Sequence, residues 1–428
     1  MSLERIREKL MEGIYLNVIK TKKFKSNSIS FYFIRNLNEK EVTKNALIPL
    51  VLKRGTSSYE NAMDIEKKLE ELYGSNLSIN VNKKGEKQVL RFTIEGPHKD
   101  FINMKNIFTE QLKILREVIY NPILENGVFL DKYVKQEKNN LKKKIKGRIN
   151  NKKQYAVERC IEKMCKEEKY SLYKYGYIED LDNISSKKLY KHYKTVLKRS
   201  PIEINVVGNV DSTFVKNSIE EIFTFEREEI INIPREEISR ENIKVKNVKE
   251  ELDINQGKLT IGYRTNIPYE DKLYEAFLVG NNILGGGPDS KLFINVREKE
   301  SLAYYVFSKL LKYKSLMLIT SGIEFHKYEK SLDIIKKQVN QMKKGNFNND
   351  NITQAKNAII TSVKSLIDDN YSISEFYLTQ TLTKDKRNID EIIKDIENVS
   401  KDDIINAFNK IELDTIYFLK NKEANKEE

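Results

Sequence analysis

The sequence contains few of the residues on which metal and redox chemistry depend. It has 3 histidines, His98, His192 and His326, and 2 cysteines, Cys160 and Cys165. No two histidines have the i, i+4 spacing of a helical zinc site, and the spacing of the cysteines matches no redox or zinc motif. From these residues we predict no metal site and no catalytic residue in this chain, and we expect reduced thiols, as in the cytoplasm.

Long hydrophobic runs are also missing. No stretch of about 18 apolar residues is present, and the N-terminus lacks the apolar core of a signal peptide. We therefore expect a cytoplasmic protein that does not bind a membrane. Only 7 prolines and 17 glycines occur among 428 residues, which argues against long flexible linkers and against a turn-rich all-β fold.

The net charge of +13 could indicate an anionic partner such as nucleic acid. However, the basic residues are spread along the chain and mixed with 63 acidic residues. The densest run, Lys132–Lys153, contains one acid, Glu137, and its apolar residues Val134, Leu141 and Ile145 fit one buried helical stripe. Only one aromatic residue, Tyr133, lies among these charges, so the run lacks the aromatic surface on which single-stranded nucleic acid would stack. We predict a solvated basic helix and expect no nucleic-acid partner, with a basic RNA- or ribosome-associated factor as a third class of function.

Two halves of the chain are similar to each other. The segments "NSISFYFIRNL" and "GKLTIGYRTNI" both alternate apolar and polar residues, and Ile29 of the first matches Leu259 of the second, an offset of 259 − 29 = 230. A helix-like run follows each segment and ends at Gly55 or Gly285, again an offset of 285 − 55 = 230. His98 and His326, each before a helix, are related by 326 − 98 = 228, and we expect a shared capping or loop role for them. A nearly constant offset indicates an internal duplication.

Each half has the same order of elements, in which strands and helices alternate without a parallel βαβ repeat. We predict an α+β fold with two homologous domains, each a mostly antiparallel sheet with helices packed on one side. The predicted boundaries are 1–227 for the first domain, 228–250 for a polar linker and 251–428 for the second domain. In the first half, Ser57 and Glu60 are expected to form a helix capping box, and Lys84-Gly85 a hairpin turn.

The glycine-rich stretch "LGGGPDSKLF" could be read as a phosphate-binding loop. A P-loop requires Gly-Lys-Ser/Thr at the start of its helix, and a dinucleotide site requires a preceding strand. Here Pro-Asp-Ser-Lys follows the glycines, and a helix precedes them. We therefore predict a turn in which Asp289 or Ser290 caps the next helix.

Arg297 and Tyr304, in "REKESLAYYV", are the one pair of candidate binding residues. A guanidinium and a phenol can both donate hydrogen bonds to one carboxylate or oxyanion. By spacing alone, a surface arginine and an ordinary strand tyrosine, one of 23, would explain them as well.

The duplicated plan resembles that of the M16 (pitrilysin/insulinase-like) metallopeptidases over nearly the whole chain. The segments that carry this resemblance are "LGGGPDSKLFINVREKESLAYYV", "KYGYIEDLDNISSKKLYKHYK" and "RGTSSYENAMDIEKKLEELYGSNLSINVNKKGE". Within this family it resembles the YmfF-type non-catalytic bacterial members. The resemblance implies the LuxS/MPP-like fold. It also implies a zinc motif, His-x-x-Glu-His, before Gly55-Thr56, but those positions hold Ala46, Pro49 and Leu50, or Asn45, Ile48 and Pro49 with a one-residue slip. The position of the third ligand, a Glu, matches Lys143 or Lys144.

In the family, one two-domain chain supplies the zinc site. The other chain supplies an arginine and a tyrosine that are seven residues apart in its sequence. The resemblance therefore implies that this chain is a non-catalytic subunit without a cofactor of its own. Arg297 and Tyr304 would hold a peptide or protein substrate at the zinc site of a homologous partner chain, as a heterodimer. It also allows a link to elongation factor P modification. The alternative is a peptidase-dead scaffold or binding protein of the same fold.

Overall fold

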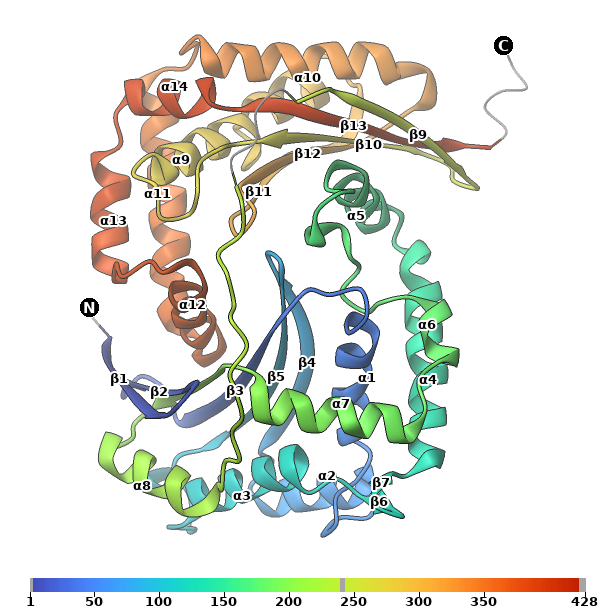
Figure 1. Ribbon diagram of the computed structural model, residues 1–428. Coiled ribbons are helices and arrows are strands. Elements are labelled where there is room, and N and C mark those ends of the chain that lie inside the picture. Colours follow the sequence, from blue (N-terminus) through green and yellow to red (C-terminus); the bar gives the residue numbers. More distant parts are fainter. Residues whose placement is uncertain (1–2, 239–242, 423–428) are drawn as a thin grey trace. The chain divides into compact units, whose positions relative to one another are not determined.

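The computed structural model describes residues 3–238 and 243–422, which form two compact units (Figure 1). Unit 1 contains Met1–Gly147, Leu172–Pro234 and Leu366–Thr379, and unit 2 contains Arg148–Ser171, Arg235–Ser365 and Gln380–Glu428. The predicted domains 1–227 and 251–428 follow the sequence repeat, whereas each compact unit also includes one segment from the opposite half of the sequence.

The sheet of unit 1 has six strands in the order β1-β2-β8-β3-β5-β4. Only β2 and β8 pair in parallel, so the sheet is mostly antiparallel. The predicted hairpin turn is confirmed, because Lys84 pairs with Lys87 and Gly85 has a φ of 61°. The strands are β1 (Glu4–Met11), β2 (Ile14–Lys20), β3 (Ser26–Asn36), β4 (Asn76–Lys84), β5 (Lys87–Pro97) and β8 (Ile202–Gly208).

Helices cover this sheet and enclose an apolar core, built from residues such as Phe33, Leu47, Phe92 and Leu112. Helix α2 is capped by Asn61, whose side chain accepts from the amides of Met63 and Asp64; the predicted Ser57/Glu60 capping box is therefore wrong. The helix begins only at Ala62, because the intervening residues form a turn against Thr56. The helices are α1 (Val42–Leu52), α2 (Ala62–Glu71), α3 (Ile107–Tyr120), α4 (Asp131–Lys146), α6 (Ile178–Asp182), α7 (Ser186–Arg199) and α8 (Ser212–Ile222).

Unit 2 repeats the plan with the strand order β11-β12-β10-β13-β9, in which only β9 and β13 are parallel. The predicted α+β class with two similar sheets is thus confirmed. Residues 246–250, expected in the linker, form the start of β9, and residues 239–242 of that linker lie outside the described residues. The strands are β9 (Lys246–Leu252), β10 (Gly257–Arg264), β11 (Ala303–Leu311), β12 (Leu316–Ile323) and β13 (Glu412–Asn421).

The helices of unit 2 lie on both faces of its sheet. Figure 1 shows α9 and α10 on one face and α5 on the other. Helix α5 packs on β10 and β13 through Cys160 and Met164, which share a core cluster with Leu318 and Tyr417. The helices are α5 (Lys152–Met164), α9 (Tyr274–Gly285), α10 (Tyr328–Lys343), α11 (Asn349–Ser365), α13 (Ile389–Asn398) and α14 (Lys401–Asn409).

The segment of the second half that belongs to unit 1 includes residues 370–379 of helix α12 (Asn370–Thr383). The hydroxyl groups of Ser374 and Tyr32 are 2.8 Å apart, and the amide of Asn205 donates to the Ser374 carbonyl. Glu375 forms an ion pair with Lys84. This segment therefore covers a polar region on the sheet of unit 1.

Candidate functional site

The segment that carries Arg297 and Tyr304 has three unusual backbone features. Arg297 lies in a π-helix, η4 (Phe293–Glu298), which is followed by Ser301 with a left-handed φ of 48°. Tyr304 lies at a β-bulge, because β11 pairs Ala303 with Ile323 but Tyr305 with Gly322. π-Helices and bulges cost stability and redirect side chains, and they are frequent at functional sites.

Both side chains are accessible. Tyr304 is 60% exposed, and Arg297 is exposed with its guanidinium 4.7 Å from the ring centroid of Phe293. Among the described residues, neither forms an ion pair or a side-chain hydrogen bond. Since η4 and β11 contact each other, the two groups lie on adjacent elements of unit 2. The phenol and the guanidinium are therefore free to donate hydrogen bonds to a ligand oxygen.

Within the glycine-rich stretch, Gly285 is buried against β11, whereas residues 286–289 are exposed. A Cβ on Gly285 would lie 2.5 Å from the backbone nitrogen of Ser308 on β11, so glycine is required for close approach. The Ser290 hydroxyl accepts from the amide of Phe293, which confirms one of the two predicted caps. With α11, the loop lines a small pocket of about 220 Å³, formed by residues such as Asn351 and Gln354. The loop thus positions η4.

The three positions of the family's zinc motif lie on α1. Ala46 and Pro49 are buried, and Leu50 is partly buried, so these side chains offer no metal ligand. With the alternative register, Asn45 is the first motif position, and its amide group is already engaged. The Asn45 side-chain nitrogen donates to the side-chain oxygen of Gln88, and the Asn45 side-chain oxygen lies 2.7 Å from Nε2 of His192.

The candidates for the third ligand, Lys143 and Lys144, are exposed on α4. The Lys144 ammonium lies 4.3 Å from the ring centroid of Tyr175. Burial raises the pKa of Tyr175, but the hydrogen bonds and positive charges of Lys144 and Lys174 together outweigh burial, so that the pKa lies below its ordinary value. Across residues 3–238 and 243–422, no group of three or more His, Cys, Asp or Glu side chains could hold a metal ion.

The three histidines have different environments. His98 caps a short helix by accepting from the amide of Asp100, whereas His326 is exposed and caps nothing. The predicted capping role is therefore confirmed for His98 but not for His326, because Glu324 occupies the capping position in the second half. His192 is buried, and burial lowers its pKa to about 4. It is a neutral core histidine that bridges α7 to Asn45 on α1.

The basic run Lys132–Lys153 is not a single helix, contrary to the prediction. Helix α4 ends at Lys146, the residues Gly147–Asn150 form a 3₁₀ turn, and Asn151 caps α5. Gly147 and the Asn150-Asn151 pair are the sequence signals that could have located this break. The predicted stripe of Val134, Leu141 and Ile145 packs as expected on the core of unit 1. Within the described ranges, no helix combines the length and apolarity needed to cross a bilayer.

Known proteins similar to this chain agree on one family. A family profile described as "Peptidase M16 inactive domain" matches residues 183–359. The chain is 40% identical to "Probable inactive metalloprotease YmfF" of Bacillus subtilis over 96% of this chain and 97% of that protein. It is 24% identical to "Uncharacterized zinc protease YmxG" of the same organism over 46% and 48% of the two chains.

A solved structure has the same fold as this chain. A conserved protein from Enterococcus faecalis V583 superposes with a TM-score of 0.89 at 27% identity, covering 98% of this chain and 99% of that one. Together with the apolar residues at the zinc-motif positions, these matches identify the chain as a member of the M16 peptidase family and a homologue of its inactive metalloproteases.

Proposed function

We propose that this chain is a non-catalytic subunit of an M16-like zinc peptidase complex in the cytoplasm. It pairs with a homologous chain that carries His-x-x-Glu-His and binds the zinc, while this chain contributes no cofactor. Arg297 and Tyr304 hold the peptide or protein substrate and stabilise the developing negative charge on its carbonyl oxygen.

The observation that carries the proposal is the contrast between two places in the same chain. The zinc-motif positions on α1 hold apolar side chains. Arg297 and Tyr304, in contrast, are exposed on a π-helix and a β-bulge, and neither side chain forms an ion pair or a hydrogen bond with the described residues. A chain that served only as a scaffold would have no need of this costly backbone. The similarity to both an inactive metalloprotease and a zinc protease of one organism agrees with a pair of homologous subunits.

The test is to co-express the chain with a zinc-bearing homologue from the same cells and to measure cleavage of a fluorogenic peptide library. Arg297→Ala and Tyr304→Phe should each lower kcat by about 100-fold, the cost of losing an oxyanion donor, while native mass spectrometry still shows a 1:1 complex. Lys299→Ala and Tyr73→Phe, also at exposed positions, are matched controls that should retain full activity.

Unchanged turnover in both Arg297→Ala and Tyr304→Phe would remove the assigned role. A stable complex that cleaves no peptide would favour the scaffold function instead.

If the substrate belongs to elongation factor P modification, deletion of the gene should change the modified fraction of that factor, measured by intact-mass spectrometry.

A further inference from the structure

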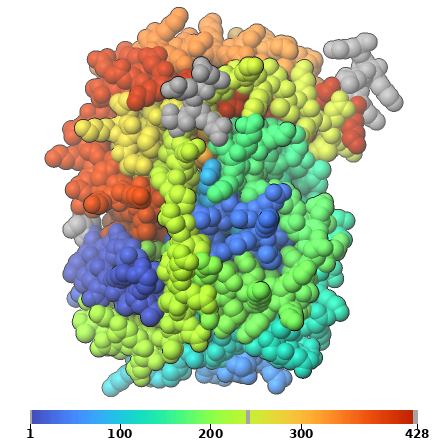
Figure 2. All heavy atoms as spheres, in the orientation of Figure 1, coloured from blue at the N-terminus to red at the C-terminus, as the bar shows by residue number. Residues whose placement is uncertain are grey.

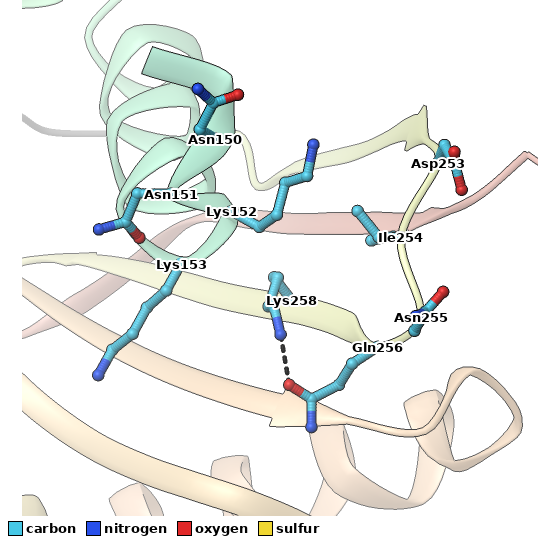
Figure 3. Close-up of a pocket in the computed structure, with 9 residues that line it drawn as sticks. All are labelled: Asn150, Asn151, Lys152, Lys153, Asp253, Ile254, Asn255, Gln256 and Lys258. Atoms are coloured by element: carbon cyan, nitrogen blue, oxygen red, sulfur yellow. Dashed lines mark hydrogen bonds between the residues drawn. The ribbon is translucent and has the colours of Figure 1, made fainter. Parts of the chain in front are cut away.

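An open pocket of about 1020 Å³ lies in unit 2, separate from Arg297 and Tyr304 (Figure 3). One wall is the start of α5, with Asn150, Asn151, Lys152 and Lys153. The other is the connection between β9 and β10, with Lys258 on the strand and Ile254 buried beneath it. The remaining lining residues are Asp253, Asn255 and Gln256.

Three ammonium groups line this pocket against one carboxylate, that of Asp253. In the described part of the chain, Lys152, Lys153 and Lys258 form no ion pair, and Lys258 donates only to the amide oxygen of Gln256. Further along α5 the opposite holds, because Arg159 and Lys163 both pair with Glu250. The lack of counter-ions is thus specific to the pocket end of the helix.

The electrostatics of the pocket are unfavourable without a ligand. Lys152 and Lys153 occupy the first turn of α5, which has no acidic residue, and cations there oppose the positive end of the helix dipole. Burial lowers the pKa of Lys258, and the charge of Lys153 lowers it further. An anion would relieve both costs. Such local conflicts are expected where a protein keeps a binding function.

The ammonium groups are arranged for separated negative charges. In Figure 3, Lys152 reaches toward the Asp253–Gln256 side, Lys258 points to Gln256, and Lys153 extends in a different direction. The Lys153 ammonium lies 4.5 Å and 4.3 Å from the ring centroids of Tyr305 and Phe307, which hold it in place. A single phosphate would require donors that converge on one point.

We propose that this pocket binds an acidic peptide segment, with the lysines pairing with its carboxylates and the side-chain NH₂ groups of the asparagines and the glutamine available to its main-chain carbonyls. This inference does not depend on the proposed peptidase function, since the pocket residues are all outside the Arg297/Tyr304 segment. It assigns a ligand class to the chain itself: peptides rich in Asp and Glu.

The test is the affinity of the full chain for a fluorescein-labelled hexaglutamate peptide, measured by anisotropy. The triple variant K152Q/K153Q/K258Q should bind roughly tenfold or more weakly. The triple variant K132Q/K142Q/K146Q, which removes the same charge from exposed positions of α4, should bind as the unmodified chain does. Carbodiimide coupling of the bound peptide should join it to Lys152, Lys153 or Lys258 in the peptide map.

Three outcomes would overturn the proposal. Equal weakening in both triple variants would mean attraction by net charge alone. Equal binding of a hexaglutamine peptide would exclude recognition of carboxylates. Displacement of hexaglutamate by tripolyphosphate at much lower concentration than by unlabelled peptide would indicate a phosphate ligand. Hexaglutamate binding is measured on the full chain alone, with no zinc-bearing homologue present, which separates this result from the test of the peptidase function.

Discussion

At the scale of single residues, the buried carboxylate of Glu168 is the group whose loss we expect to destabilise the protein most. It lies 2.6 Å from Arg264 and 2.7 Å from Lys314, and Arg264 is also 2.9 Å from Asp414. All four side chains are almost completely inaccessible to solvent. A buried charge is tolerated only while its partners are present.

Glu168→Gln should lower the free energy of unfolding at pH 7 by about 3–5 kcal/mol, because the buried cations Arg264 and Lys314 would both lose the carboxylate with which they pair. Burial raises the pKa of Glu168, but Arg264 and Lys314 lower it further, to below its ordinary 4.5. The difference from the unmodified chain should therefore be complete above about pH 4.5 and shrink as the pH falls further. Denaturant titrations measure it, and Glu167→Gln, at the exposed neighbour, is the control.

His192 gives a second pH dependence, with the opposite chemistry. Its pKa of about 4 lies below the ordinary 6.5 because burial disfavours the cation. Its contribution to stability is complete above pH 6.5 and should fall by about 3 kcal/mol as the pH approaches 4. In an NMR titration, the resonance that His192→Gln removes should move only near pH 4. A midpoint near 6.5 for this resonance would contradict the assignment, and His326→Gln should retain it.

The residue scale also shows where sequence reasoning stops. Arg297 and Tyr304 could be singled out only with the help of a family resemblance, because their spacing alone is that of any arginine and strand tyrosine. The bulge at Tyr304 depends on the pairing of β11 with β12, which no local pattern encodes. Lys152 and Lys153 were visible as charges, but the pocket opposite them is formed by residues about 100 positions later.

At the scale of elements, the glycine run before η4 allows a direct test of packing against ligand binding. Gly285→Ala should destabilise the protein by about 1–3 kcal/mol, since its Cβ would collide with the Ser308 backbone. Gly287→Ala should change stability by less than about 0.5 kcal/mol, because a Cβ there meets nothing within 4 Å. Thermal unfolding of the two variants decides this. The reverse order would mean that the loop is held in place by something other than β11.

Most elements could be predicted from the sequence, but their partners could not. Alternation located β3 and β10, and the repeat offset predicted a similar sheet in each half. The stripe of apolar residues on α5 shows that one face is buried, yet it does not say against which sheet. Helix α12 has no such stripe, because nearly all of its residues from Ile373 onward are buried. For this reason the exchange of these segments between the two halves could not be anticipated.

At the scale of the whole molecule, this exchange should couple the unfolding of the two units. The segment Leu366–Thr379 belongs to unit 1 but is joined at both ends to chain that belongs to unit 2, and helix α12 continues from one unit to the other. We expect a single cooperative transition in denaturant. Hydrogen exchange of peptides from β3 and β10 should show one common midpoint, and two well-separated midpoints would refute the coupling.

The position of α12 near the end of the chain has a consequence for biosynthesis. The last strand of the first sheet, β8, ends at Gly208, whereas Ser374, which pairs with Tyr32 of that sheet, is added 374 − 208 = 166 residues later. At ordinary rates of translation this interval lasts on the order of ten to thirty seconds. During that time the buried polar groups of β3 and β8 have no partner from α12, so a nascent chain would present them to chaperones.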